Sequence, residues 1–432
     1  MKAILENLWN RKREEIWLFL ELIIITIVAW VVFDPAIVNL YYRSLPMGYD
    51  TDRLLYADVE LSAMGEDTGD PYEVTEERRM QLLRQLKAVE GVENVYFYDQ
   101  IYYALGNDRH SYWMVPRGED TLYVTNIEFI PDANFFETYG LRPLPGSPSA
   151  EELSRLSYNS LQTVLTRSAA IAIFGTEDVV GRHFQFFTDP PLERTVAGVV
   201  EDVRVSVPTA ERACILMPSQ LLSNGVRIII RLQDGINLHR FLEEHRRDLV
   251  RGGQTDFCRI SRLMTYEEHL KKMELAAGRT QEVNRSLALA LFFLLNLILA
   301  VIGTVWLHAK RRAEECGVRR AFGATRTRLL GSFLAEGAVL ATVAVVIGCI
   351  IFLNYAYSGL STVDGIELFE TMYINFASYL PADRTWVDGF WSHFLVVSAC
   401  VYIIILCTVL IGTAIPAWRI TRTQITEALR DE

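Results

Sequence analysis

The chain has 432 residues, half of them hydrophobic, and a formal net charge of −11. So large an apolar share is unusual for a soluble protein and predicts membrane-spanning segments. The acidic balance argues against nucleic acid as a partner and favours neutral or cationic partners.

The first residues have the pattern of an amphipathic helix. Ile4, Leu5, Leu8 and Trp9 fall on one helical face, and most charges fall elsewhere. Residues 1–15 are therefore expected to form a helix in the membrane interface ahead of the first span. A frayed terminus is the alternative.

Four apolar segments are long enough to cross a bilayer, for which about 20 residues are needed. The predicted spans are residues 16–33, 286–308, 329–353 and 394–415. The first could instead be a cleaved signal peptide, but its apolar run is too long and no Ala-x-Ala site follows. The pair Asp34-Pro35 predicts that the helix stops just past this span. We therefore expect a retained anchor.

The loops between these spans carry opposite charge. Residues 309–328 hold seven Lys or Arg against two acids, whereas residues 354–393 hold one Arg against five acids. Because basic loops remain on the cytoplasmic side, the short basic loop is expected there and the acidic loop outside. With four spans, both termini, including the tail 416–432, are then cytoplasmic.

Residues 34–285 form one large outside domain in this topology, with 27 basic against 38 acidic side chains. Each end of this domain has the order strand, helix, strand. The first set is 53–61, 75–89 and 92–98, and the second set is 226–232, 238–250 and 256–263. Two such sets predict a split ferredoxin-like (porter) subdomain.

The middle of the outside domain differs from its ends. Residues from about 104 to 215 contain short β-like runs and most of the prolines, and they predict an inserted, mainly β subdomain. The expected fold class is therefore an α-helical membrane protein with four transmembrane helices and a large α+β extracytoplasmic domain. Within that domain, Cys214 and Cys258 could pair in an oxidising compartment or remain as two buried thiols.

A long helical pattern follows the outside domain. Thr265 and Glu268 have the spacing of a capping box. The 48 residues from Thr265 to Arg312 contain no proline, and as one helix they would extend about 70 Å. We expect one continuous rod, with two helices hinged at Gly278 as the alternative.

The sequence carries no motif of an enzyme. It lacks a phosphate loop, a Gly-x-Ser-x-Gly elbow and a His-Glu-x-x-His helix, and its histidines are scattered. No catalytic residue, metal ligand or cofactor site is predicted, so the chain is expected to be a non-catalytic membrane subunit.

The third span contains an acid beside a stripe of small residues. Glu336 lies next to Gly331, Ala335 and Ala338, which recur at helical spacing. Small residues allow helices to pack closely, and intramembrane acids usually have a partner. These four residues are therefore predicted to serve helix packing, with Glu336 contacting a neighbouring helix.

The basic loop 309–328 has the pattern of an exposed helix rather than of a spacer. Glu315 and Arg319 are spaced i,i+4, which supports a helix, and Val318 and Phe322 form an apolar edge. A basic loop whose only role is to fix the orientation of the chain in the membrane needs positive charges but no apolar edge. Arg320 adds a further charge, and Gly317 and Gly323 allow close approach or a sharp turn.

Residues 315–325 (ECGVRRAFGAT) and 329–336 (LLGSFLAE) resemble the MacB/FtsX-type permeases of ABC transporters. Cys316 stands where that family usually has Ile, and Ile425 in the C-terminal tail stands where Pro is usual. The outside domain also resembles the MacB periplasmic core, over residues 129–140, 170–182 and 196–203.

The resemblance implies that 309–328 is a coupling loop docking on a separate ABC ATP-binding subunit, which would use ATP and Mg²⁺. The coupling residues would then be Glu315, Gly317, Val318, Arg319, Arg320, Phe322 and Gly323. It also implies a dimer with a second permease copy or a paralogous permease, a bacterial inner-membrane location, and a periplasmic or outer-membrane partner.

Three functions follow as hypotheses. The first is a permease that couples ATP hydrolysis to movement of its periplasmic domain (mechanotransmission), with a peptide, lipoprotein or drug as cargo. The second is an FtsX-like regulator of a cell-wall hydrolase or another periplasmic partner, and the third is a membrane-anchored enzyme. The large two-part outside domain favours the first, and the sequence does not name the cargo.

Overall fold

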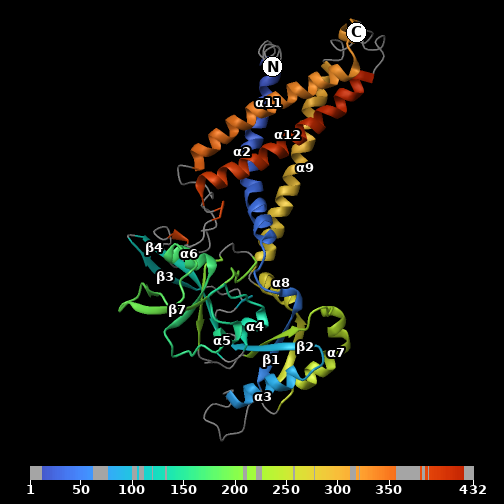
Figure 1. Ribbon diagram of the computed structural model, residues 1–432. Helices are drawn as coiled ribbons and strands as arrows, with labels where there is room; N and C mark the ends of the chain where they lie inside the picture. The colour runs from blue at the N-terminus through green and yellow to red at the C-terminus, as the bar shows by residue number, and fades with distance from the viewer. Residues whose placement is uncertain are drawn as a thin grey trace. The chain divides into compact units, whose positions relative to one another are not determined.

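The computed structural model divides the chain into two compact units (Figure 1). The helical unit comprises Met1–Tyr41, Gln281–Met372 and Thr385–Glu432, and the α+β unit comprises Tyr42–Thr280 and Tyr373–Arg384. The structure describes residues 12–61, 76–99, 105–106, 111–118, 120–131, 134–207, 212–219, 226–255, 258–276, 278–311, 318–320, 322–356, 380–381, 385–387 and 389–422.

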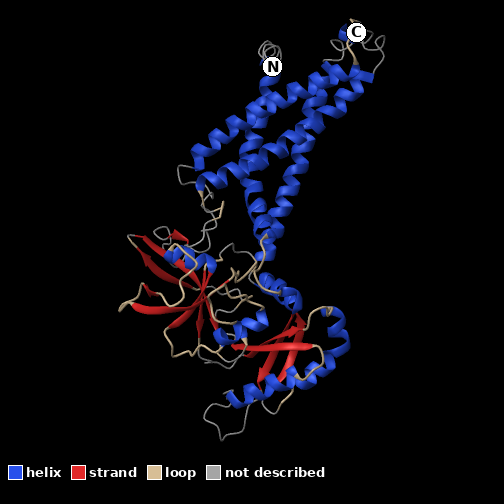
Figure 2. Ribbon diagram, viewed as in Figure 1, coloured by secondary structure: helices blue, strands red, loops and turns tan. Residues whose placement is uncertain are grey.

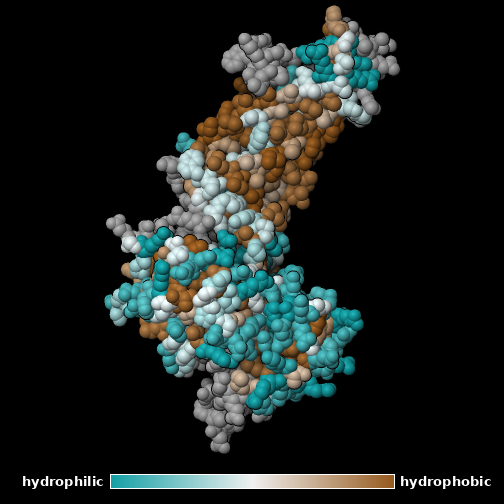
Figure 3. Space-filling view, in the orientation of Figure 1, coloured by the Kyte–Doolittle hydropathy of each residue, from teal (hydrophilic) through white to brown (hydrophobic). Residues whose placement is uncertain are grey.

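The helical unit is built on long apolar helices, and the strands found among the described residues belong to the other unit (Figure 2). Its helices are α2 (Lys12–Ser44), α9 (Arg279–Arg311), α11 (Arg326–Tyr355) and α12 (Phe390–Arg422). Among the described residues, four segments have the length and hydropathy of spans, namely Ile16–Ser44, Thr280–Ala300, Arg326–Tyr355 and Phe390–Ile415. Apolar side chains cover most of the visible surface of this unit (Figure 3). The chain is therefore a membrane protein with four candidate spans.

The first of these helices does not stop at Asp34-Pro35, so that prediction was wrong. The helix α2 contains Pro35 and continues to Ser44. Proline removes one helical hydrogen bond, but burial of Ala36, Val38 and Tyr42 holds the turn that follows. Of the predicted interfacial helix, residues 1–11 lie outside the described residues, and α2 already begins at Lys12.

The predicted rod from Thr265 to Arg312 was also wrong, and the hinged alternative is what the structure contains. The capping box is present: the Glu268 amide donates to Thr265 Oγ1 and the Thr265 amide to Glu268 Oε2, both at 3.2 Å. The helix α8 (Tyr266–Ala276) that it begins ends before Gly278, whose φ is 76°. That left-handed conformation is open to glycine and ends a helix.

One sheet of the α+β unit has the split ferredoxin-like topology predicted from the sequence. Its strands are β1 (Leu54–Leu61), β2 (Val92–Asp99), β9 (Val226–Leu232) and β10 (Cys258–Thr265), and its helices are α3 (Glu76–Lys87) and α7 (Leu238–Gly252). The strand order is β10-β1-β9-β2, and every neighbouring pair is antiparallel. A short 3-10 turn, η1 (Thr51–Arg53), leads into β1.

The segment between β2 and β9 forms a second, mixed sheet. Its strands are β3 (Tyr112–Arg117), β4 (Asp120–Phe129), β5 (Gln162–Thr166), β6 (His183–Phe186), β7 (Leu192–Val200) and β8 (Cys214–Pro218), and its helices are α4 (Phe135–Tyr139), α5 (Ala150–Ser154) and α6 (Arg167–Phe174). The order is β11-β4-β8-β5-β7-β6, with β3 beside β4. The strand β11 (Leu380–Pro381) comes from the loop before α12, a pairing that the sequence did not predict. The predicted fold class is confirmed.

The two subdomains of the α+β unit share one core. The Tyr96 ring of β2 lies 5.2 Å from Phe135 and 5.9 Å from Tyr139 of α4, and Tyr139 lies 6.0 Å from Tyr266 of α8. All four rings are fully buried. Because rings from both subdomains pack against one another, the subdomains form one packed body.

The two cysteines of this unit are buried thiols that form no disulfide with each other, as the second alternative had it. Cys214 Sγ lies 3.5 Å from the Val203 carbonyl, and Cys258 Sγ lies 3.1 Å from Thr255 Oγ1. Each thiol has its own local partner, so they are not bridged.

Candidate functional site

The described part of the predicted coupling loop ends in a tightly capped helical turn. Residues 318–320 are helical, and Gly323 has a φ of 89°. The Gly323 amide donates to the Arg320 carbonyl and the Ala324 amide to the Arg319 carbonyl, both at 3.0 Å. This pair of bonds is a Schellman motif, which requires a left-handed residue and therefore favours glycine.

The next helix begins directly after this turn. Thr325 is the N-cap of α11, and its Oγ1 accepts from the Arg328 amide at 3.3 Å. Only Ala324 separates the left-handed glycine from the cap. Two adjacent caps fix the path of the chain between the loop helix and α11.

The apolar edge predicted on this loop is exposed. Phe322 is 89% exposed and Val318 is 46% exposed. The Phe322 amide donates to the Val318 carbonyl at 3.1 Å, so the two residues lie one helical turn apart. Arg319 is exposed and Arg320 half-buried. Glu315 and Gly317 lie outside the described residues, and the docking role of the whole set stays a prediction.

The small-residue stripe of α11 is only partly packed. Glu336 is buried at 8% exposure, and Ala335 and Ala338 are half-buried. Within the described residues, Gly331 has open space beside its Cα. Among the described residues, no contact therefore supports the predicted packing role of Gly331, which stays a prediction.

Two other glycines of α11 lie close to neighbouring helices, and neither was predicted from the sequence. A Cβ added at Gly337 would lie 3.4 Å from Val409 of α12, and one at Gly348 would lie 2.7 Å from Thr26 of α2. The same small-residue pattern, continued along α11, could have identified them.

A buried polar pair joins α2 to α12. His393 Nε2 lies 2.6 Å from Asp34 Oδ1, and His393 Nδ1 lies 3.0 Å from the Val387 carbonyl. Asp34 and His393 are 5% and 3% exposed. The pair was not predicted from the sequence, where Asp34 was interpreted as part of a helix stop.

Aromatic rings surround the pair. The Trp30 ring stacks on Phe352 at 4.2 Å and on His393 at 6.0 Å, and its Nε1 donates to Ser398 Oγ at 3.0 Å. The Trp386 ring meets His393 edge-on at 5.6 Å. The imidazole of His393 is thus packed against the rings of Trp30 and Trp386.

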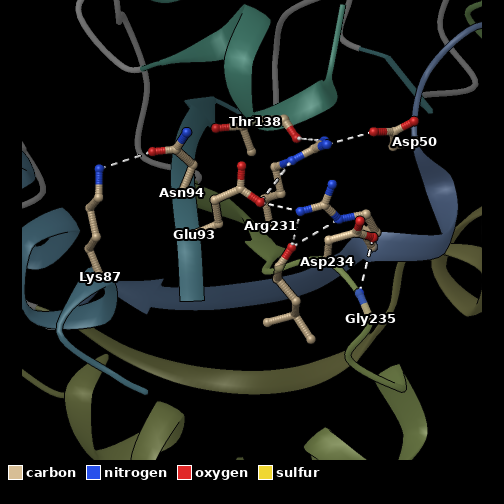
Figure 4. Close-up of polar contacts among 10 residues, drawn as sticks. Asp50, Lys87, Glu93, Asn94, Thr138, Arg231, Asp234 and Gly235 are labelled. Carbon is tan, nitrogen blue, oxygen red and sulfur yellow. Dashed lines mark hydrogen bonds and ion pairs between the residues drawn. The ribbon is translucent and has the colours of Figure 1, made fainter. Parts of the chain in front are cut away.

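In the α+β unit a buried arginine connects the two subdomains (Figure 4). Arg231 of β9 donates to Asp50 Oδ2 at 2.5 Å and to the Thr138 carbonyl of α4 at 3.1 Å. Its Nε lies 3.5 Å from Glu93 of β2, which also pairs with Arg53. The group is a neutral network of two cations and two anions, which is how buried charges are normally accommodated.

A second buried arginine holds the end of α2. Arg204 is 1% exposed and donates to the carbonyls of Leu45 at 2.7 Å, Tyr42 at 3.0 Å and Val207 at 2.5 Å. Carbonyls at a helix C-terminus lack helical partners and carry partial negative charge, which suits a guanidinium. The last turn of α2 is thereby built into the α+β unit.

Burial changes the ionisation of single groups in the α+β unit. The ring of His269 stacks on Tyr56 at 3.6 Å, and burial lowers the pKa of His269 to about 4 although Asp58 opposes the shift. Burial raises the pKa of Glu128 and that of Tyr49. No group of three or more metal-ligating side chains occurs in the part of the chain that the structure describes.

Comparisons with known proteins agree with the motifs. Residues 287–425 match the family model of the FtsX-like permease C-terminal domain. The macrolide export ATP-binding/permease protein MacB of Campylobacter jejuni (strain 81-176) is 24% identical over 204 residues, and MacB of strain NCTC 11168 matches to the same extent. Each alignment covers 43% of this chain and 29% of the relative, so less than a third of the relative's length is matched.

Solved structures of outside domains are similar as well. The periplasmic region of MacB from Actinobacillus actinomycetemcomitans matches 52% of this chain and 94% of its own length, at 16% identity and a TM-score of 0.30. The extracellular domain of the noncanonic ABC-type transporter YknZ from Gram-positive bacteria matches 48% and 100%, at 13% identity and a TM-score of 0.28. The resemblance to MacB/FtsX-type permeases is confirmed by the family match and the curated relatives.

Proposed function

Starting from this resemblance to MacB/FtsX-type permeases, we propose that the chain couples ATP hydrolysis by a separate ATP-binding subunit to conformational change of its α+β unit. The coupling loop 309–328 is the docking segment. The observation that carries the proposal is the apolar pair of Val318 and Phe322, exposed at the end of a capped turn. A phenylalanine held almost fully in solvent is the kind of side chain that anchors a protein interface.

In this proposal the caps give the docking segment its stiffness. Gly323 and Thr325 fix the path from the loop helix into α11, so a push on Phe322 is carried into α11 rather than absorbed by the loop. Residues Glu315, Arg319 and Arg320 set register at the rim, and Gly317 allows close approach.

The remaining assignments follow from the same proposal. ATP and Mg²⁺ belong to the partner subunit, and the chain works beside a second permease copy or a paralogous permease. It lies in a bacterial inner membrane with both termini in the cytoplasm. The positive charge of 309–328 supports this orientation. The cargo class is a peptide, lipoprotein or drug that the α+β unit handles outside, together with a periplasmic or outer-membrane partner.

The test is to measure how much ATP-binding subunit co-purifies with variants of the loop. Phe322→Ala removes a buried anchor of the complex, and we expect about 2 kcal/mol weaker binding, roughly a 30-fold change. Arg319→Ala removes a rim charge, and we expect a smaller loss. Ile171→Ala, at an exposed apolar residue of the α+β unit, is the matched control and should change nothing.

Equal retention of the partner by Phe322→Ala and Arg319→Ala would defeat the proposed docking mode. A second assay separates transport from regulation: ATP hydrolysis by the reconstituted complex is measured with candidate cargoes. If no cargo stimulates it but a cell-wall hydrolase is activated, the FtsX-like regulatory function replaces the transport function.

A further inference from the structure

The contacts of His393 determine where its protons lie. The Val387 carbonyl can only accept a hydrogen bond, so Nδ1, 3.0 Å away, carries a proton. On the opposite side of the ring, Nε2 and Asp34 Oδ1 are 2.6 Å apart. Two groups at this distance share a proton, because two lone pairs facing each other would repel.

The shared proton makes the pair electrically neutral. With the proton on Nε2 the pair is an imidazolium and a carboxylate, and with the proton on Oδ1 it is a neutral imidazole and a carboxylic acid. If the proton leaves to water, a neutral imidazole faces a carboxylate and one negative charge remains. A lone charge at a site only 3–5% exposed is strongly unfavourable.

Side chains from the elements packed around the pair contact it directly or through neighbouring residues. From α2 come the Trp30 ring and Tyr41, which reaches the site through Trp386 at 5.0 Å. From α11 come Phe352 and Cys349, which hydrogen-bonds to Ser398 of α12. From α9 comes Phe293, which contacts Phe33 beside Asp34.

We propose that Asp34 and His393 form a buried proton-binding site that fastens α2 to the first turn of α12. With the proton bound, the two helices are joined by a charge-assisted hydrogen bond. When the proton is lost, the carboxylate must move toward water, and α2 separates from α12 at this level. The site goes beyond the proposed function and does not depend on it, since it needs neither the ATP-binding subunit nor a cargo.

The first experiment observes the proton directly. The full chain is labelled with ¹⁵N-histidine, reconstituted in lipid nanodiscs, and followed by two-bond ¹H–¹⁵N correlation spectra between pH 5 and 9. The His393 signals are those missing from His393→Gln. We expect Nδ1 to remain protonated at every pH and Nε2 to exchange between protonated and free states. A His393 that lacks the proton on Nδ1 would overturn the proposal.

The second experiment measures the consequence for stability. The proton is held in the folded state, so the midpoint of thermal unfolding should fall as the pH rises and the pair loses its proton. Asp34→Asn retains the shape of the carboxyl group, and its amide can donate to Nε2 of a neutral imidazole. This variant should fold, and its midpoint of thermal unfolding should fall much less with rising pH than that of the wild type.

His183→Gln, which changes a histidine 62% exposed at its side chain, is the control and should keep the wild-type decline. An Asp34→Asn protein with an unchanged decline would overturn the proposal. If His393→Gln fails to fold, the Asp34→Asn measurement still decides the proposal.

Discussion

The two units cover their apolar side chains to different extents. In the α+β unit the cores under both sheets are made of residues that are almost fully buried within the chain. In the helical unit, the most apolar windows of the four candidate spans are only 28%, 11%, 33% and 33% buried. The α+β unit can thus satisfy the hydrophobic effect in water by itself, whereas the helical unit needs lipid or other protein around it.

One buried histidine in each unit shows a second difference, in the contacts of its ring. His269 in the α+β unit lies on a tyrosine ring and is neutral, because burial lowers its pKa. His393 in the helical unit is equally buried but lies between two acceptors. At similar burial, the two histidines therefore differ in their contacts, with an aromatic ring against His269 and two oxygen atoms beside His393.

If the α+β unit is a tightly packed body, its closest backbone contact should be the most sensitive to an added methyl group. Gly48 has a φ of 83°, and a Cβ there would lie 2.0 Å from the Asp202 carbonyl oxygen. Left-handed strain and a clash with backbone together should cost about 5 kcal/mol in Gly48→Ala. Denaturant unfolding of the full chain measures this loss.

Gly235→Ala is the matched control for Gly48. Gly235 has a φ of 79°, and the structure shows open space beside its Cα among the described residues. Only the strain remains there, at about 1 kcal/mol. If both variants lose a similar amount of unfolding free energy, the clash with the backbone at Gly48 contributes nothing to the loss in Gly48→Ala.

The second prediction concerns the buried charges that join the subdomains. Arg231→Met removes the cation between Asp50 and Glu93, so Asp50 and the Thr138 carbonyl lose this partner, whereas Glu93 still pairs with Arg53. We expect a loss of about 3–4 kcal/mol in the free energy of unfolding. The measurement is again denaturant unfolding of the full chain.

Arg259→Met tests whether burial is the cause. Arg259 pairs with Glu60 on the neighbouring strand, but both side chains are more than half exposed. Surface pairs contribute at most about 1 kcal/mol. A comparable loss for Arg259→Met would contradict the assignment of Arg231 as a buried connector.

The third prediction sharpens the contrast between the histidines. The pKa of His269 is about 4 in the folded chain, below its ordinary value of 6.5. The unfolded state therefore binds the proton first, and stability falls as the pH drops from 6.5 toward 4, by roughly 3 kcal/mol at most. His269→Phe retains the stacking and should remove this acid sensitivity, which unfolding between pH 4 and 7 measures.

His183→Gln is the control, since the side chain of His183 is exposed. It should leave the acid dependence as it is. If the stability of His269→Phe falls with acid as much as that of the wild type, the carboxylates rather than His269 cause the acid sensitivity.

Much of the fold could be predicted because its signals are local. Apolar runs revealed the spans, and the order strand, helix, strand at each end of the outside domain revealed the split sheet. The capping box at Thr265 was equally readable, because both partners lie within one turn. The exceptions were Pro35, held inside α2 by tertiary packing, and Gly278, whose left-handed φ no periodicity indicates.

The polar sites could not be predicted because their partners are distant in the sequence. Asp34 and His393 are 359 residues apart, and Asp50 and Arg231 are 181 residues apart. Such pairs exist only once the elements have packed. The exposed pair Val318 and Phe322 was readable from spacing alone, since one helical turn brings both to one face.

The smallest effect is expected in α9, the least buried of the four candidate spans. The helix α9 has a window only 11% buried, and its exposed side includes Phe292, Asn296 and Leu299. Asn296 donates to the Phe292 carbonyl at 2.8 Å, which leaves a second amide hydrogen and the side-chain oxygen for another helix. If a second permease copy covers this side, Asn296→Leu should weaken self-association by about 1 kcal/mol, roughly fivefold.

Self-association is measured in nanodiscs by single-molecule counting over a range of lipid-to-protein ratios. Asn39→Leu is the matched control, since Asn39 of α2 makes the same bond to the carbonyl four residues back, at 2.7 Å. Lipid accepts leucine better than asparagine, so a surface facing only lipid would leave Asn296→Leu as monomeric as the wild type or make it fold better. Loss of association in Asn296→Leu but not in Asn39→Leu would assign the sparse packing of α9 to a protein partner rather than to lipid.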